Sequence, residues 1–396
     1  MYTREHNQLR MLLSVLQQYD HAMPLSRFMG QFYKQNKQMG SRDRRMLSGS
    51  LYNYFRLGNV LKDLGVKEKL GISAYLCSAT GTSFSDFLTR EFTRLDPANQ
   101  SSAPELKIRE VQEKYPGFRS EDLFPFPGLI AEHLHTDGLY HSMLTQPRVW
   151  MRIRKAFHEE VLAELSTREM AFEIDNELEN CISVSAGTSL DALNSFEKGY
   201  FEIQDRSSQC TGQFIDVKEG MSLWDCCAAS GGKSLMIADK NPGLDLRVSD
   251  IRASVLENLK QRFKKAGISR FKTSVTDLTN QSDLSRIDEN FDLILADVPC
   301  SGSGTWGRTP EMISAFHETG LQTYSGRQKK IVMNILDHLK PGGQLLYITC
   351  SVFKAENEEV VDYILKNSSL RLVDQRHLSG YAQGADNMFF AKLVKE

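Results

Sequence analysis

The hydrophobic pattern near the N-terminus is that of amphipathic helices. In the stretch SRDRRMLSGSLYNYFR, apolar side chains recur one helical turn apart at Leu47, Leu51 and Phe55. Ser41 or Asp43 is expected to cap this helix at its start. Two stretches that contain Pro, LDPANQSSAPE and KYPGFRSEDLFPFPG, then interrupt the pattern and predict loops between helical pieces. This part of the chain is therefore predicted to be helical.

The pattern changes after Pro147, where strand-like and helical segments alternate. The segments RVWMRIR, NCISVSAG and YFEIQD are strand-like, and HEEVLAELSTREM and SLDALNSFEKG between them are helical. They predict a small α/β unit. Its first strand carries Arg148, Arg152 and Arg154 beside Trp150, and a small basic sheet with aromatic side chains suits single-stranded RNA.

A longer alternation of strands and helices begins near Gly220. The strands are near-continuous apolar runs: SLWDCC, LRVSD, FKTSV, FDLILADV and QLLYITCS. Helical segments such as ASVLENLKQRFKKAG and RQKKIVMNILDHL separate them. This order predicts an α/β fold with a doubly wound parallel sheet. Ligands of such sheets bind beyond the carboxyl ends of the strands.

Composition and charge restrict the class of protein. With 41% hydrophobic and 25% charged residues, no bilayer-length apolar run and a charged N-terminus, the 396-residue chain is expected to be a cytoplasmic globular protein. The net charge of −2 argues against a general polyanion binder. Residues 1–60, however, carry nine Lys or Arg against three acids, which favours a phosphate-bearing partner at that end. A solvated basic helix face explains the same charge equally well.

Acidic residues follow the carboxyl ends of three predicted strands. The first strand runs into DCCAASGGKS, whose Gly231 and Gly232 permit close approach of a ligand to the backbone, without the spacing of a nucleotide-phosphate loop. Asp250 lies 18 residues beyond Gly232, where an acid accepts ribose hydroxyls. Asp277 and Asp297 follow the next two strands. Three such acids suit a cationic nucleoside such as S-adenosylmethionine, whereas any one alone would be a helix cap or a loop residue.

Two of the seven cysteines occupy similar positions. Cys300 in ADVPCSGSG and Cys350 in YITCS each end an apolar strand at the predicted ligand edge. They are either small buried hydrophobic side chains, as most free cysteines are, or chemical groups. No cysteine pair has zinc spacing, so no metal site is expected. Packing roles are expected for the remaining cysteines other than Cys227: Cys77, Cys181, Cys210 and Cys226.

These motifs resemble the RsmB/Nol/Nop/Sun family of S-adenosylmethionine-dependent RNA cytosine-5 methyltransferases. The resemblance rests on YFEIQDRSSQ, DCCAASGGKS, ADVPCSGSGTWGRTPE, LKPGGQLLYITCSVFKAENEEVV and NMFFAKLVK, and covers residues 147–396. The helical part, with SRDRR, resembles the NusB-like domain of RsmB-type members. The expected domains are a NusB-like RNA-binding domain at 1–140, an RRM-like unit at 141–215 and a Rossmann-like methyltransferase domain at 216–396.

The resemblance assigns roles to individual residues. Asp250 is the expected ribose ligand, Asp277 the adenine-side acid, and Asp297 the acid between methyl donor and base. The sequence departs from the family at Ser230, where Pro is usual, and at Val255, where Arg is frequent. The expected cofactor loop comprises Cys227, Ala228, Ala229, Ser230, Gly231, Gly232 and Lys233.

The implied chemistry explains why two thiols are present. Carbon 5 of cytosine is a poor nucleophile, and a thiolate that adds to carbon 6 makes it electron-rich enough to accept a methyl group. The resemblance makes Cys350 the nucleophile and gives Cys300 a part in product release, with ribosomal RNA as the expected substrate. Two alternatives stay open: a DNA cytosine-5 methyltransferase that uses the PCS cysteine, and a non-catalytic RNA-binding assembly factor on the same fold.

Overall fold

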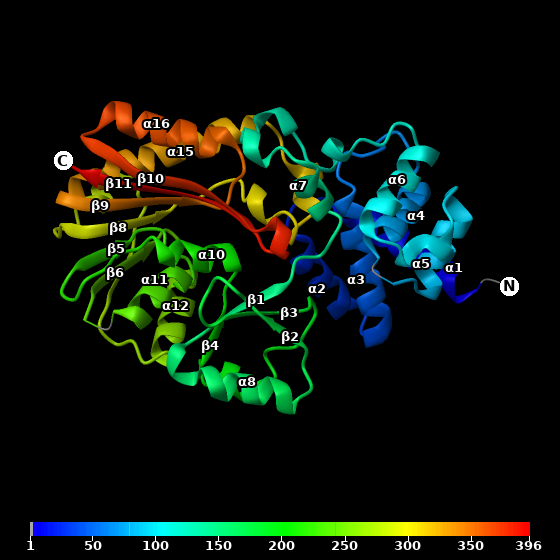
Figure 1. The fold of residues 1–396 in the computed structure, drawn as a ribbon, viewed down its shortest axis with the longest axis horizontal. Helices are drawn as coiled ribbons and strands as arrows, with labels where there is room; N and C mark the ends of the chain where they lie inside the picture. Colours follow the sequence, from blue (N-terminus) through cyan, green and yellow to red (C-terminus); the bar gives the residue numbers. More distant parts are fainter. Residues whose placement is uncertain (1–2, 79, 242) are drawn as a thin grey trace. The chain divides into compact units, whose positions relative to one another are not determined.

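The chain folds into two compact units. The computed structural model describes residues 3–78, 80–241 and 243–396. One unit consists of residues 1–146 together with 305–317, and the other of residues 147–304 together with 318–396 (Figure 1).

The first unit is helical, as predicted. Leu47, Leu51 and Phe55 lie in its core, which confirms the helical spacing. The expected cap is wrong, because the helix starts at Ser41 with Gly40 as its N-cap and has no side-chain cap. Its α-helices are α1 (Arg4–Gln18), α2 (Leu25–Gln35), α3 (Ser41–Arg56), α4 (Val66–Cys77), α5 (Ser83–Phe92), α6 (Pro104–Lys114), α7 (Asp137–Ser142) and α14 (Glu311–Ala315).

The helix α14 reaches this unit from a distant part of the sequence. The segment 305–317 follows directly on the PCS loop and packs among the helices. The buried Arg56 guanidinium donates to the carbonyls of Met143 and Gly307 at 3.0 and 2.8 Å. The Leu25 amide donates to the Glu311 carboxylate at 3.0 Å. The sequence pattern did not predict this exchange, because the segment lies within the predicted methyltransferase region.

The second unit contains a small antiparallel sheet of order β2-β3-β1-β4. The pattern predicted three of its strands and missed the short β2. Hydrophobic residues of β1, β3 and β4 pack with those of α8 into a core of their own. Its elements are β1 (Val149–Ile153), α8 (His158–Thr167), β2 (Phe172–Ile174), β3 (Cys181–Val184), α9 (Asn194–Glu197) and β4 (Phe201–Ile203), followed by α10 (Arg206–Cys210).

The polar residues of the small sheet have partners within this unit. Arg152 and Arg154 both form ion pairs with Asp239, at 2.8 and 3.0 Å. Arg148 pairs with Glu173 at 3.0 Å. Trp150 is only 5% exposed. The side chain that looked suited to base stacking is therefore buried, and the RRM-like role of this sheet stays a prediction.

The main sheet has seven strands in the order β10-β11-β9-β8-β5-β6-β7. Five of them, β5 to β9, run parallel, which confirms the predicted doubly wound fold. Two further strands, β10 and β11, extend one edge antiparallel and were not predicted. The elements are β5 (Ser222–Asp225), α11 (Gly232–Lys240), β6 (Asp245–Asp250), α12 (Ala253–Lys265), β7 (Lys272–Val275), α13 (Gln281–Leu284), β8 (Phe291–Asp297), α15 (Thr319–Ile335), β9 (Leu339–Thr349), α16 (Glu358–Asn367), β10 (Leu370–Ser379) and β11 (Asn387–Lys395).

Helices cover both faces of this sheet (Figure 1). Successive residues of β8 alternate between the faces, so that Leu293 and Leu295 pack with α11 and α12. Ile294 and Ala296 pack with α15 and α16 on the other side. Because both faces are buried, the strand sequences read as continuous apolar runs rather than as alternating ones.

Candidate active site

The candidate site lies where the strand order of the main sheet reverses. The chain passes from β5 outward to β6 and β7 and then returns to β8 on the other side of β5. At such a switch point the loops that leave neighbouring strands diverge and open a crevice for a ligand. The loops after β5, β8 and β9 carry the predicted glycines, Asp297 and the two cysteines, so the sheet brings these motifs to one edge.

The glycines of the loop after β5 are required by its conformation. Ala229 and Gly231 have positive φ of 46° and 80°. A Cβ on Gly231 would come within 2.8 Å of both Leu259 and Phe263 on α12, so no larger residue fits there. A Cβ on Gly232 would meet nothing within 4 Å. This loop thus packs tightly on one side and leaves room on the other, at the start of α11, which fits a bound nucleoside.

Asp250, at the end of β6, holds this loop. Its carboxylate accepts hydrogen bonds from the Ala229 amide at 3.0 Å and from the Arg252 amide at 2.9 Å. The Arg252 guanidinium also donates to it at 3.0 Å. Burial alone would raise the pKa of Asp250, but the Arg252 guanidinium and these amides lower it below its ordinary value. The acid is therefore a buried carboxylate anion that can accept further donors such as hydroxyls.

The two departures from the family pattern have local partners. Ser230 stands where Pro is usual, and both its carbonyl and its hydroxyl accept hydrogen bonds from Arg262, at 2.7 and 2.8 Å. Val255 stands where Arg is frequent, and here Arg252 supplies a guanidinium next to Asp250.

Asp277, after β7, makes a local turn. Its carboxylate accepts hydrogen bonds from the Thr279 amide at 2.9 Å and the Thr279 hydroxyl at 2.7 Å. These bonds lower the pKa of Asp277. The residue lies at the outer parallel strand, and its expected adenine-side role stays a prediction.

Asp297, at the end of β8, forms an ion pair with Lys233 in the first turn of α11. The two side chains approach to 2.6 Å, and the Lys233 side chain is 10% exposed. Burial alone would lower the pKa of Lys233, but the Asp297 carboxylate raises it above its ordinary value, with smaller contributions from Cys350 and Asp225. Lys233 is therefore a buried cation that interacts electrostatically with Cys350.

Asp225 lies beneath this pair. It is 1% exposed, and its carboxyl group accepts a hydrogen bond from the Ser234 hydroxyl. Burial raises the pKa of Asp225 to about 7, and the negative charge of Asp297 adds to the rise. Two carboxyl groups and one ammonium thus share the buried end of the crevice.

The two cysteines face each other. The sulfur atoms of Cys300 and Cys350 lie 3.3 Å apart, a distance at which one thiol donates a hydrogen bond to the other. The hydrogen bond to Cys350 and burial together raise the pKa of the Cys300 thiol well above its ordinary value. Cys300 is therefore a neutral thiol next to Cys350.

A buried glutamate ties the two cysteine loops together. The carboxylate of Glu356 is fully buried and accepts a hydrogen bond from the Ser301 amide at 2.7 Å. It also accepts from the hydroxyls of Ser301 and Ser351, at 2.5 and 2.6 Å. Ser301 and Ser351 follow the two cysteines directly, so one side chain sets the positions of both thiols. Gln328 of α15 adds a further donor at 3.2 Å.

Neither Glu356 nor Gln328 was expected as a site residue from the sequence pattern. The signal for Glu356 was present in SVFKAENEE, where an acid stands six residues beyond Cys350 in a stretch that had to stay close to the thiol. Gln328 carried no such signal, because it is one polar residue on a helix of mixed composition.

The four cysteines with expected packing roles are buried or half-buried. Cys181 and Cys226 are fully buried, and burial raises the pKa of Cys181 to about 12. Burial likewise raises the pKa of Cys77 to about 12 and that of Cys210 to about 11. Such thiols stay protonated at neutral pH, as expected for packing residues.

Within residues 3–78, 80–241 and 243–396, no group of three or more His, Cys, Asp or Glu side chains is arranged to hold a metal ion. None of the helices in these ranges combines the length and the apolar character needed to cross a membrane.

Comparison with known sequences identifies relatives. Residues 213–393 match the family described as 16S rRNA methyltransferase RsmB/F. The chain is 31% identical over 323 residues to ribosomal RNA small subunit methyltransferase B of Cronobacter sakazakii, with 73% of each protein covered. It is 30% identical over 303 residues to the protein of that name from an Enterobacter species, covering 74% of this chain and 66% of the relative. The matches span from 60% to 73% of the length of such curated relatives.

Comparison with solved structures gives the fold. The crystal structure of PH0851 superposes on the whole chain with a TM-score of 0.74 at 19% identity, and the match covers 100% of both chains. The structure of NSun6 from Pyrococcus horikoshii with SFG gives a TM-score of 0.57 at 17% identity, covering 63% of this chain and 91% of the other. Both likenesses confirm the α/β methyltransferase architecture.

Proposed function

The chain belongs to the RsmB/F family of 16S rRNA methyltransferases, and from that premise we propose that it methylates carbon 5 of a cytosine in small-subunit ribosomal RNA. The observation that carries this proposal is the pair of thiols 3.3 Å apart, at the strand edge that also bears the Gly-rich loop and Asp250. The curated relatives bear the name of ribosomal RNA enzymes, which does not favour a DNA substrate or a purely structural role.

S-Adenosylmethionine is the proposed cofactor and supplies an electrophilic methyl group. Residues Cys227–Lys233 and Asp250 fit this group, because the loop is open at Gly232 and the buried Asp250 carboxylate suits ribose hydroxyls. The NSun6 structure, with the ligand SFG, supports the choice. Asp277 is proposed on the adenine side.

Cys350 is the proposed nucleophile. Its sulfur adds to carbon 6 of cytosine, which places electron density on carbon 5. The buried ammonium of Lys233 interacts electrostatically with Cys350 and is proposed to stabilise the attacking thiolate. Asp297, paired with that ammonium, is proposed to hold nitrogen 3 of the ring by a hydrogen bond while the adduct exists.

Cys300 is the proposed release residue. After carbon 5 carries the methyl group, solvent water takes up the proton of carbon 5. The electron pair of that C–H bond forms the 5,6 double bond, and the bond between Cys350 and carbon 6 breaks with its electrons passing to the sulfur. The raised pKa of Cys300 keeps this thiol protonated, so that it can donate a proton to the departing Cys350 sulfur. Its position 3.3 Å from that sulfur suits this step.

Two measurements test the proposal. Mass spectrometry of nucleosides from a small-subunit rRNA transcript, incubated with the protein and S-adenosylmethionine, should detect 5-methylcytidine. Replacement of the ribose ligand, Asp250→Ala, should weaken S-adenosylmethionine binding about 10- to 100-fold, because a charged hydrogen bond contributes about 1.5–3 kcal/mol. Unchanged affinity by calorimetry would remove Asp250 from the site, and the absence of 5-methylcytidine would contradict the proposed reaction.

A further inference from the structure

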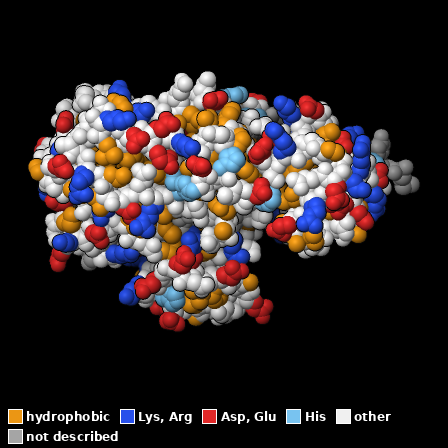
Figure 2. Space-filling view, turned by 45° about the horizontal axis from the view of Figure 1, so that its top comes forward, with side chains coloured by type: hydrophobic (Ala, Val, Ile, Leu, Met, Phe, Trp, Pro, Cys, Tyr) orange, Lys and Arg blue, Asp and Glu red, His pale blue; other side chains and the backbone are white. Residues whose placement is uncertain are grey.

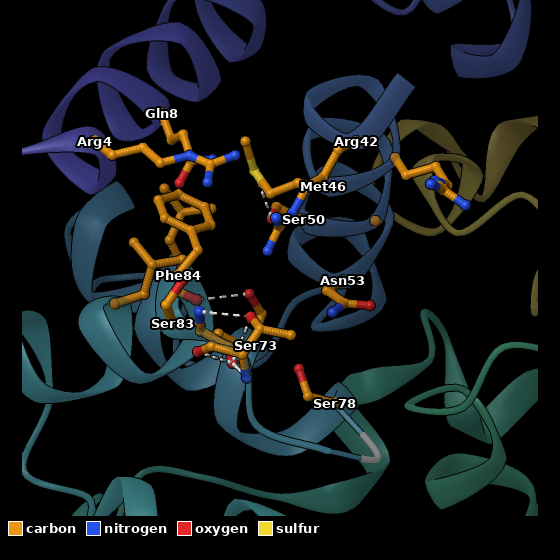
Figure 3. Close-up of a pocket in the computed structure, with 17 residues that line it drawn as sticks. Arg4, Gln8, Arg42, Met46, Ser50, Asn53, Ser73, Ser78, Ser83 and Phe84 are labelled. Atoms are coloured by element: carbon orange, nitrogen blue, oxygen red, sulfur yellow. Dashed lines mark hydrogen bonds between the residues drawn. The ribbon is translucent and has the colours of Figure 1, made fainter. Parts of the chain in front are cut away.

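The helical unit contains a pocket that the proposed reaction does not use. Its cavity of about 420 Å³ lies among α1, α3 and the start of α5 and is of a size that small ligands occupy. Figure 3 shows Arg4 reaching from α1 towards Arg42, Met46 and Ser50 of α3, with Ser83 and Phe84 nearby at the start of α5.

The charge of this pocket is one-sided. Three arginines line it, Arg4, Arg42 and Arg45, and no acidic side chain does. Asp43 lies beside it and pairs with Arg4 at 3.2 Å. Within the part of the chain that the structure describes, the side chains of Arg42 and Arg45 form no ion pair or hydrogen bond. Two guanidinium groups are therefore available to an anion.

The lining includes an exposed helical glycine that packing does not require. Gly49 lies in the middle of α3, where glycine destabilises a helix by about 1 kcal/mol relative to alanine. A Cβ at this position would meet nothing within 4 Å. The fold does not require a glycine here, and its effect is to leave space beside the arginines.

Neutral donors complete the lining. Ser50, Ser78 and Ser83 contribute hydroxyl groups to it. The α5 helix is ten residues long, and its N-terminus, capped by Thr82, carries partial positive charge. Guanidinium groups, hydroxyls and a helix N-terminus are the groups that bind phosphate in proteins.

We propose that this pocket binds a backbone phosphate of single-stranded RNA. The proposal rests on the proposed function in one respect, since RNA is the substrate of that reaction. Residues 1–60 carry nine basic residues against three acids, and Figure 2 shows Lys and Arg side chains along the outer edge of this unit. A polyanion that continues past the pocket would meet that charge, whereas a free phosphate would not.

The test is RNA binding by full-length variants, with a small-subunit rRNA transcript and a short oligocytidine as probes. Arg42→Gln combined with Arg45→Gln should weaken binding of both probes about tenfold and lower the salt dependence by roughly one to two phosphate contacts. The matched control is Arg27→Gln with Lys34→Gln, two exposed basic residues on α2 that do not line the pocket. This control should change RNA affinity by less than about threefold, which is the effect expected from a single exposed ion contact.

A second pair of variants separates shape from charge. Gly49→Leu fills the pocket and should also weaken RNA binding about tenfold, while it favours the helix. Gly30→Leu is its control, because Gly30 is likewise a helical glycine with nothing within 4 Å of its Cβ, outside the lining. The helical far-UV circular dichroism signal and the thermal unfolding transition should be unchanged in all variants and report that the helical unit is folded. S-Adenosylmethionine affinity, measured by calorimetry, should be unchanged as well, because that site lies in the other unit.

Three outcomes would overturn the proposal. The pocket variants and their controls could bind RNA with equal affinity, or the charge variants could lose affinity while Gly49→Leu does not. Inorganic phosphate and cytidine monophosphate could also compete for the pocket as well as RNA does. The last result would assign the pocket to a free phosphate ligand. A protein that binds RNA through this pocket but forms no 5-methylcytidine would contradict the proposed reaction and leave the pocket assignment standing.

Discussion

The two cysteine loops share the dipeptide Cys-Ser at the end of a strand and have different surroundings. Each follows a parallel strand, β8 for Cys300 and the adjacent β9 for Cys350, and each continues with a serine that donates to Glu356. The Cys300 thiol has a pKa raised by its hydrogen bond to Cys350 and by burial. Cys350 instead interacts electrostatically with the buried ammonium of Lys233. Similar motifs thus keep the Cys300 thiol protonated and place Cys350 under the influence of a cation. This difference suits the two thiols to different proposed roles.

The largest effects are expected when each thiol is removed. Cys350→Ala should abolish methylation, because the bond to carbon 6 cannot form, and should leave S-adenosylmethionine affinity unchanged. Cys300→Ala should stall after methyl transfer and accumulate a covalent protein–RNA complex, visible on a denaturing gel and removed by protease.

The double variant is the control for this pair and should give no covalent complex. If both cysteines serve only packing, each single variant would lose modest stability and neither would crosslink. A crosslink from Cys350→Ala but not from Cys300→Ala would reverse the two roles.

Glu356→Gln should impair both loops at once. Glutamine keeps the size of the side chain but replaces one carboxylate oxygen by an NH2 group. That group cannot accept the hydrogen bonds that the hydroxyls of Ser301 and Ser351 donate, so both serines should shift. A displacement of about 1 Å at a reacting group lowers turnover about 100-fold. We expect a fall in kcat of that order with unchanged S-adenosylmethionine affinity.

Two further measurements separate positioning from general destabilisation. In a Cys300→Ala background, Glu356→Gln should slow formation of the covalent complex, which a purely structural role would leave unchanged in folded protein. Glu359→Gln, an exposed position on α16, should behave as the parent chain. Normal kcat in Glu356→Gln would show that the two loops hold their thiols without it.

Lys233→Met should affect the Cys350 side alone. Loss of the ammonium removes the attraction that favours the thiolate and leaves Asp297 without its ion-pair partner. The rate of covalent-complex formation in a Cys300→Ala background should fall about tenfold. Lys240→Met, at the exposed end of α11, should leave that rate unchanged. An unchanged rate in Lys233→Met would mean that this ammonium does not stabilise the nucleophile.

Asp225→Asn should give the smallest effect, on stability. In the folded chain Asp225 titrates at about 7, whereas in the unfolded chain it titrates near the ordinary value of about 3.9. Between these values the folded state binds the extra proton, so the contribution of Asp225 to stability falls as pH rises through that window. Asn carries no such proton. Between about pH 5 and about pH 8 the parent chain should therefore lose about 2–3 kcal/mol of stability that the variant does not lose, at about 1.4 kcal/mol per pH unit up to the folded pKa.

Urea unfolding at the two pH values measures that difference. Identical pH dependence in the parent chain and Asp225→Asn would show that Asp225 is ionised in the folded protein and does not share the charge cluster beside Cys350.

Much of the catalytic architecture could be predicted from local sequence. The β5 to β9 strands were recognisable because burial on both faces requires continuous apolar runs. The Gly-rich loop was recognisable because only glycine accepts the positive φ and close packing of Gly231. The β10 and β11 strands were missed. The β10 strand mixes exposed and half-buried residues, so its sequence has no continuous apolar run. It follows α16 and joins the sheet by pairing with β11, which comes later in the chain.

By itself, the sequence determined the α/β class, the order of the parallel strands' motifs and the residues that end them, because each of these follows from local periodicity and from residue types. Only the tertiary structure decided which of these residues touch. Lys233 pairs with Asp297, 64 positions away, and Glu356 binds Ser301, 55 positions away. The segment 305–317 joins the helical unit through contacts such as that of Gly307 with Arg56, about 250 positions away. Contacts at such separations depend on how strands are ordered in the sheet and on burial that removes water from charged groups, and neither is encoded in any short stretch of the chain.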